Sequence, residues 1–263
     1  MSTARLSAAI ACLTFAAAAG AATPPANHRN FISCPIVRDT PTVPCWLAEY
    51  GGELYYLGIQ TDVSAEFHPP LLGHKVLVEG TVKDGPRICG GIVLEPVRLS
   101  IVAEPDSSCN TMLPAEERYN LTFEPPRPPG PSGGRLAFNT LPMPVKPVAV
   151  KREPHSYSLS YDFNGLISFR HPFQLTPILD LARAMKATQV EIEGHRGAAL
   201  LSDGRVLQES PDQARRRAEQ VAELLRGAGL TAPTYSVRWI DAAPAPNGSD
   251  DYRERRVDIT IRP

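Results

Sequence analysis

The chain has 263 residues, a formal net charge of −1 and 27 prolines. This length accommodates two domains of ordinary size, each with its own core. Acidic and basic residues are balanced and interspersed, which excludes a nucleic-acid partner held by bulk electrostatics. The prolines are clustered, and we expect the clusters to mark boundaries between domains.

Residues 1–22 have the composition of a secretory signal peptide. A single arginine, Arg5, precedes an apolar run, and small residues lead up to Thr23 as they do at a signal peptidase site. The segment is too short and too rich in alanine for a stable span. We therefore expect export, no transmembrane span in the mature chain, and a periplasmic protein that associates with the outer membrane.

Four cysteines remain once this peptide is removed, namely Cys34, Cys45, Cys89 and Cys109. An even number of cysteines in an exported chain predicts two disulfides, and none of the spacings fits a zinc site. Three connectivities are open. The pairs that are local in sequence, Cys34–Cys45 and Cys89–Cys109, are preferred because they impose the fewest topological demands.

Residues 30–112 alternate short strand-like runs with turn signals such as Gly51-Gly52. Helical periodicity is nearly absent, so we expect a small all-β domain, either a barrel or a sandwich. The run at 72–82, with alternating apolar residues and recurring glycines, resembles the central strands of an OB-fold. That resemblance implies an OB-like barrel stapled by the disulfides. Because few basic residues accompany its aromatic residues, we expect those aromatics to pack in the core rather than to form a ligand platform.

Residues 124–154 are dominated by proline, which neither continues a helix nor sits in a central strand. Such a composition favours extended polyproline II, so we interpret the segment as a semi-rigid linker. After it, the hydrophobic period alternates between that of a strand and that of a helix. The expected elements are a strand at 157–163, a helix at 175–185, a strand at 188–193, a helix at 214–228, and strands at 235–240 and 256–261.

Three motifs punctuate this last region: Gly194-His195 at a strand end, residues 213–218 with Val221 following, and the terminal run Arg255-Arg256-Val257-Asp258-Ile259. Together they resemble the OmpA-like peptidoglycan-binding domain family. In that family a strand ends in G-[HY]-T-D, a helix begins N-x-x-L-S-x-x-R-A, and the last strand begins R-R-V-x-I. The resemblance covers 155–263 and implies an α/β fold, a βαβαββ sandwich.

The resemblance also implies a site for the diaminopimelate of the peptidoglycan stem peptide. The Asp of T-D meets an ammonium in the family, and the Arg of R-A meets a carboxylate. Arg217 matches the arginine, whereas the Asp position falls on Gly197, so half of the clamp is missing. Asp203, in a longer loop, is the candidate replacement, and His195 and Arg256 complete the predicted ligand-binding set.

No nucleophile elbow, phosphate loop, dinucleotide fingerprint or metal-ligand spacing occurs in the sequence. We therefore predict no enzyme activity, no cofactor and no metal. The leading hypothesis is a non-catalytic envelope protein that anchors noncovalently to peptidoglycan. The alternative is a protein-interaction module that contacts other envelope proteins through a degraded peptidoglycan site, which the missing Asp favours. A carbohydrate-binding or enzymatic β domain is a third class, without residues to name.

Overall fold

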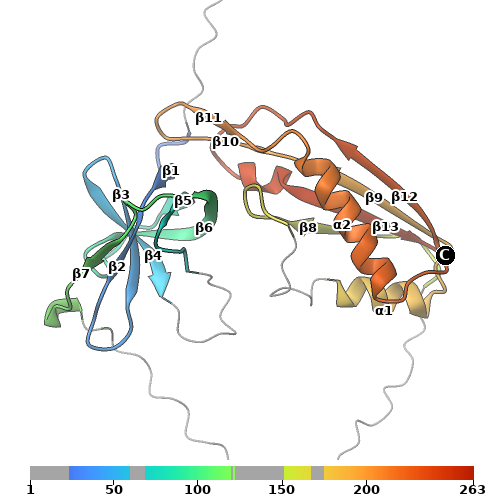
Figure 1. Cartoon of the computed structure of the whole chain (residues 1–263), viewed down its shortest axis with the longest axis horizontal. Coiled ribbons are helices and arrows are strands. Elements are labelled where there is room, and N and C mark those ends of the chain that lie inside the picture. Colours follow the sequence, from blue (N-terminus) through green and yellow to red (C-terminus); the bar gives the residue numbers. More distant parts are fainter. Residues whose placement is uncertain (1–23, 60–68, 120, 122–150, 167–174) are drawn as a thin grey trace, which may run out of the picture.

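The computed structural model describes residues 24–59, 69–119, 121, 151–166 and 175–263 (Figure 1). The predicted signal peptide and residues 124–150 of the predicted linker lie outside these ranges. Within them the chain forms a seven-stranded sheet, a two-stranded sheet and a four-stranded sheet. A helix long and apolar enough to cross a membrane does not occur in the described residues.

The N-terminal half forms the seven-stranded sheet, in the order β1-β5-β6-β4-β3-β2-β7. Phe31, Val76 and Val78 lie at the centre of its apolar core, packed with residues of β3, β4 and β6. A short 3₁₀ turn, η1 (Glu117–Tyr119), follows the sheet. The strands are β1 (His28–Ser33), β2 (Pro35–Arg38), β3 (Cys45–Tyr50), β4 (Glu53–Ile59), β5 (His74–Val82), β6 (Ile92–Pro105) and β7 (Thr111–Leu113).

The sheet does not close into a barrel, so the predicted OB-like barrel is wrong. The strands β1 and β2 follow one another across Cys34, yet they lie near opposite ends of the ladder, β1 against β5 and β2 against β3. In the middle of this sheet, β6 pairs with β4 only through Ile92 and Val93. Beyond Val93, the edge of β6 that faces away from β5 therefore has no strand partner in the described part of the chain. We call this the outer edge of β6.

Two disulfides staple this sheet, as predicted, but the preferred pairing is wrong. Cys34 is bonded to Cys109 and Cys45 to Cys89, with sequence separations of 75 and 44 residues. The first joins the β1–β2 junction to the segment before β7, and the second lies in a small core with Leu47. Strand pairing decides the connectivity, because it brings distant cysteines together. The two bonds fit an oxidising compartment outside the cytoplasm.

The C-terminal half forms the four-stranded sheet, in the order β12-β9-β13-β8, with both α-helices on one face (Figure 1). The hairpin β10–β11 and the 3₁₀ turn η3 (Asp251–Glu254) lie at the end nearer the first sheet. The elements are β8 (His155–Ser160), α1 (Thr176–Ala184), β9 (Gln189–His195), β10 (Ala198–Leu200), β11 (Val206–Gln208), α2 (Gln213–Gly227), β12 (Thr234–Ile240) and β13 (Arg256–Arg262).

Alternation along β9 and β13 buries every second side chain under the helices and leaves the others on a polar face. The start of α2 crosses β9 closely at Gly194. A Cβ at that position would lie 2.1 Å from the carbonyl oxygen of Ala214, so only glycine fits. This crossing fixes the start of α2, and with it Arg217, over the end of β9.

The chain as a whole is mostly β, so the predicted α/β fold, a βαβαββ sandwich, is wrong. The described residues contain only two α-helices, and both belong to the C-terminal half. The segment expected to be a loop between 194 and 213 folds as the hairpin β10–β11. Strands dominate because the short apolar runs are separated by polar turns, and such turns connect antiparallel strands into hairpins.

The two halves touch along a seam with an apolar and a polar part. Leu77 of β5 packs with Ala199 and Leu201 of the hairpin region, with Phe163 beside them. Asn30 of β1, only 3% exposed, donates from its side-chain amide to the carbonyl oxygens of Leu200, at 3.0 Å, and Gly248, at 2.9 Å. Buried polar groups that are hydrogen-bonded to one another in this way fix the relative orientation of the two halves and also hold them in contact.

Candidate functional site

Arg217, the one residue that matches the stem-peptide clamp, is fully buried in an ion pair with Glu209. Its Nη1 donates to one carboxylate oxygen at 2.9 Å and its Nη2 to the other at 2.5 Å. This is the fork-to-carboxylate geometry in which arginine holds an anion most strongly. A carboxylate of the chain itself thus occupies the anion position that the family pattern assigns to a ligand.

The remaining donors of Arg217 are also used within the chain. Its Nε donates to the carbonyl oxygen of Gly165, Nη1 to that of His195 and Nη2 to that of Asp162, at 3.0 to 3.1 Å. All five N–H groups of the guanidinium are therefore satisfied. The guanidinium lies over the ring of Tyr161, 4.7 Å from its centroid, and burial raises the pKa of that phenol against the lowering effect of Arg217.

Glu209 is saturated as well. One carboxylate oxygen accepts a hydrogen bond from the backbone N–H of Asn164, the other from that of Gly197, both at 2.7 Å. With the two bonds from Arg217, each oxygen accepts two donors. The charges and hydrogen-bonding groups of both side chains are thus satisfied within the chain. A ligand carboxylate would have to displace Glu209 to reach Arg217.

Asp203, the predicted replacement for the missing Asp, lies in the turn of the β10–β11 hairpin. It accepts from the backbone N–H of Arg205 at 3.0 Å and from the Arg205 guanidinium at 2.8 Å. These contacts hold the pKa of Asp203 below its usual value. The carboxylate that pairs with Arg217 belongs to Glu209, which no motif marked and whose position after β11 depends on the hairpin.

His195 and Arg256 lie on the opposite, polar face of the sheet, although the backbone carbonyl of His195 reaches Arg217. The ring nitrogen Nε2 of His195 lies 3.1 Å from Glu193 and 3.2 Å from Asp258. Arg256 donates to Asp258 at 3.0 Å and to Glu254 at 2.8 Å. The four predicted ligand-binding residues therefore belong to three separate places.

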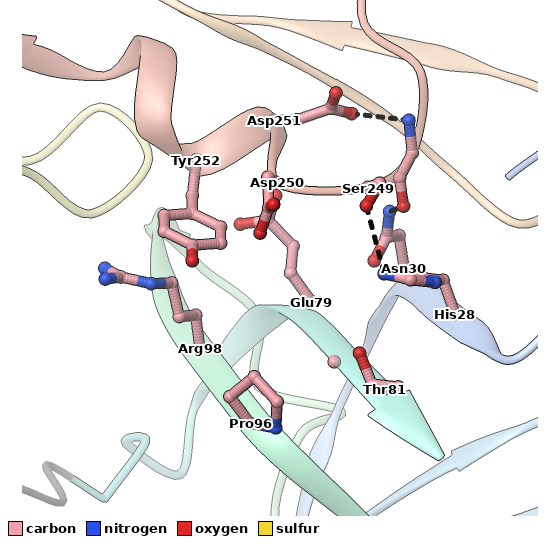
Figure 2. Close-up of a pocket in the computed structure, with 12 residues that line it drawn as sticks. His28, Asn30, Glu79, Thr81, Pro96, Arg98, Ser249, Asp250, Asp251 and Tyr252 are labelled. Carbon is pink, nitrogen blue, oxygen red and sulfur yellow. Dashed lines mark hydrogen bonds between the residues drawn. The ribbon is translucent and has the colours of Figure 1, made fainter. Parts of the chain in front are cut away.

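A small cavity lies in the seam between the two halves (Figure 2). Asn30 of β1 and Glu79 of β5 line it on one side, and Asp250 and Tyr252, from the turn at η3, line it on the other. Its volume is about 40 Å³, enough for water but far below the roughly 300–1,000 Å³ of small-molecule sites. The cavity therefore has room for water rather than for a small-molecule ligand.

A larger groove, of about 510 Å³, opens farther along the same seam. Leu77 and Ile32 from the first sheet and Phe163 and Leu207 from the second half form its apolar floor. Residues 100–104 of β6 line it consecutively, in the part of that strand that pairs with β5 alone among the described strands. The groove therefore combines apolar surface with a strand that has a single strand partner, and no sequence motif predicted it.

No protein-family model matches the sequence, and no curated protein matches it. Among solved structures, the chain is similar to a MotB-like protein from Desulfovibrio vulgaris, at 17% sequence identity and a TM-score of 0.33. The match covers 41% of this chain and 75% of that one. A similarity of this size identifies neither fold nor activity, and the likeness to the OmpA-like family stays a resemblance.

Proposed function

We propose that the chain is a non-catalytic, periplasmic protein-interaction module of the cell envelope, in which an internal carboxylate closes the stem-peptide site of the OmpA-like pattern. The observation that carries this proposal is the fully buried pair of Arg217 with Glu209. Direct anchoring to peptidoglycan, which the terminal R-R-V-x-I run favours, is the rival.

Displacement of Glu209 by a ligand would leave a buried carboxylate without its cation. That penalty is several kcal/mol per ion, which exceeds the roughly 1.5–3 kcal/mol that a charged hydrogen bond contributes. The ammonium of diaminopimelate also lacks its partner, because Gly197 holds the Asp position. A Cβ on Gly197 would lie 2.7 Å from Cγ of the buried Arg255, so the lost carboxylate has no room to return.

The surface that we assign to the partner is the 510 Å³ groove. The outer edge of β6 there presents backbone donors and acceptors without a strand partner among the described residues. An extended segment of a partner protein would add a strand to this edge and place alternate apolar side chains against Leu77 and Phe163. Main-chain hydrogen bonds would supply affinity, and the apolar floor would supply specificity.

The first test is sedimentation of the oxidised chain with purified sacculi. We expect no more retention of the wild type than of an Arg217→Lys variant, and no effect of free diaminopimelate. The exposed Arg215→Ala serves as a matched arginine control. Retention that free diaminopimelate competes away, and that Arg217→Lys loses while folded, would replace this proposal with the anchoring hypothesis.

The second test places a photo-crosslinking residue at Ile101, in the groove wall, or at Met112 on β7, which is exposed but outside the groove. We expect a discrete adduct with an envelope protein from position 101 and none from 112. Substitution of Leu207 by Asp on the groove floor should then abolish the adduct. Identical patterns from 101 and 112, or no adduct from either, would count against the groove as the partner surface.

A further inference from the structure

Three side chains with metal-binding chemistry converge on the polar face of the four-stranded sheet. Glu193 and His195 lie two residues apart on β9, so they point to the same face. Asp258 of β13 pairs directly with Glu193 in the antiparallel ladder. Strand alternation and register together bring one imidazole and two carboxylates to one spot, with their ligand atoms all within 4.8 Å of one another.

The ring nitrogen of His195 has an unusual environment. Its Nε2 is buried and makes no hydrogen bond within the described structure. It nevertheless lies 3.1 Å from Oε1 of Glu193 and 3.2 Å from Oδ2 of Asp258. The nitrogen is thus close to both oxygens without being aligned on either, whereas buried polar atoms ordinarily have a partner.

The two nitrogen-to-oxygen separations are close to those around a tetrahedral metal ion. Zinc bonds of about 2.0–2.2 Å hold neighbouring ligand atoms roughly 3.3–3.6 Å apart. Both nitrogen-to-oxygen distances are within a few tenths of an ångström of that range. An ion between the three atoms would give the buried nitrogen the partner that it lacks.

Two arginines beside the cluster orient its carboxylates and reduce the attraction of those carboxylates for a cation. Arg238 pairs with Oε2 of Glu193, so the other carboxylate oxygen, Oε1, faces His195. Arg256 donates to the same oxygen of Asp258 that faces His195, while sharing its charge with Glu254. Outer partners of this kind fix ligand orientation in metal sites. The two arginines balance the two carboxylates, so the cluster does not need a metal ion for charge neutrality alone.

We propose that Glu193, His195 and Asp258 form a binding site for a divalent transition-metal ion, with Zn²⁺ the best match. Imidazole favours zinc and its neighbours over Mg²⁺ and Ca²⁺, which take all-oxygen sites. Three protein ligands leave one position of a tetrahedral ion open for water or for a ligand from outside. The Asp258 side chain is 38% exposed, so that position is reachable from solvent. This site does not depend on the proposed interaction function.

The test is calorimetric titration of the oxidised, metal-stripped chain with Zn²⁺ alone, supported by equilibrium dialysis. We expect one ion per chain. His195→Gln should weaken binding by more than the roughly 10–100-fold that follows loss of an outer-shell partner, and Glu193→Gln and Asp258→Asn should weaken it as well. His155→Gln, on β8 of the same sheet, is the matched control and should bind like the wild type.

Circular dichroism and thermal melting of each variant separate loss of a ligand from loss of the fold. Asp258→Asn, at a half-exposed position, keeps the test valid should His195→Gln unfold. Substitution of Co²⁺ for zinc should give a visible absorption band that Asp258→Asn alters. No zinc binding by the wild type, or binding unchanged in folded Asp258→Asn and Glu193→Gln, would overturn the proposal and leave an imidazole held between two carboxylates.

Discussion

Arg217 and Glu209 form an ion pair in which neither side chain is exposed and every hydrogen-bonding position is filled within the chain. The pair joins α2 to the end of β11, and through the carbonyl of His195 it also reaches β9. The arginine that resembles a ligand-binding residue is therefore part of the internal structure of the C-terminal half. We therefore expect its removal to affect the stability of the fold.

Breaking this pair from one side should be far more damaging than replacing both partners. Arg217→Met or Glu209→Leu alone leaves a buried, uncompensated charge, so each should lower the free energy of unfolding by about 3–5 kcal/mol. The double variant Arg217→Met with Glu209→Leu removes both charges and should lose much less than the sum. Urea denaturation of the four proteins measures the cycle.

The matched control is the exposed pair of Arg215 with Glu219 on the same helix, at 46% exposure for both side chains. Loss of that pair should change stability by no more than about 0.3–0.5 kcal/mol. Additive losses at Arg217 and Glu209, or a loss at Arg217 no larger than at Arg215, would mean that the buried pair is not a coupled unit.

Local periodicity predicted the C-terminal helices well. The helix expected at 175–185 is α1, Thr176–Ala184, and the stripe that includes Ala218 and Val221 is buried as expected. The helix expected at 214–228 ends one residue early, because Ala228 is the exposed C-cap. These features depend on neighbours three and four residues apart, which a sequence displays directly.

Long-range pairing could not be predicted in the same way. Glu209 meets Arg217 only because an unmarked hairpin turns the chain back, and Arg255 meets Glu79 across 176 residues. Asp258 joins Glu193 and His195 through strand register, which is set by tertiary packing. The sequence therefore identified Arg217 and His195 as notable residues without the partners that give them their environment.

The disulfide pairing gives a direct chemical prediction. Non-reducing peptide mapping should recover Cys34 linked to Cys109 and Cys45 linked to Cys89. Replacement of Cys45 and Cys89 together by Ala should lower the free energy of unfolding by about 2–4 kcal/mol, since it releases a long loop of the unfolded chain. Recovery of Cys34 linked to Cys45 would show that the local pairing is the correct one.

Restoration of the family Asp at position 197 should damage the fold instead of creating a ligand site. A Cβ at Gly197 would crowd Cγ of Arg255, which is 1% exposed and unable to withdraw. Gly197→Ala should therefore lower the free energy of unfolding by about 1–3 kcal/mol, and Gly197→Asp by at least as much. Thermal and urea unfolding measure both.

Gly227, at the end of α2, is the matched glycine, because a Cβ there meets nothing within 4 Å. Gly227→Ala should be neutral or should stabilise the chain by about 0.5–1 kcal/mol. If Gly197→Asp were as stable as the wild type and gained retention on sacculi, the stem-peptide site would be recoverable and the closed-site proposal would fail.

The seam between the two halves should respond to pH through Glu79. This carboxyl is 7% exposed and pairs with Arg255, with Asp251 and Arg98 as further charged neighbours. Burial raises its pKa, against the lowering effect of Arg255. A carboxyl whose folded pKa exceeds its unfolded value contributes stability that is fully present below about 4.5 and is lost as pH rises through the folded pKa. The stability of the wild type relative to Glu79→Gln should therefore increase as pH falls toward 4.5.

Asp106, in the turn directly after β6, provides a comparison of opposite sign in the same half of the chain. Hydrogen bonds from Ser108, together with Lys75, lower its pKa to about 2 from the ordinary 3.8. Its contribution is present above 3.8 and is lost as pH falls toward 2, so the stability of the wild type relative to Asp106→Asn should decrease on acidification. Urea unfolding of the wild type and both variants between pH 2 and pH 8 measures the two differences. Because salt and net charge act on all three proteins alike, two differences that change in the same direction would show that local burial and hydrogen bonding do not control these carboxyls.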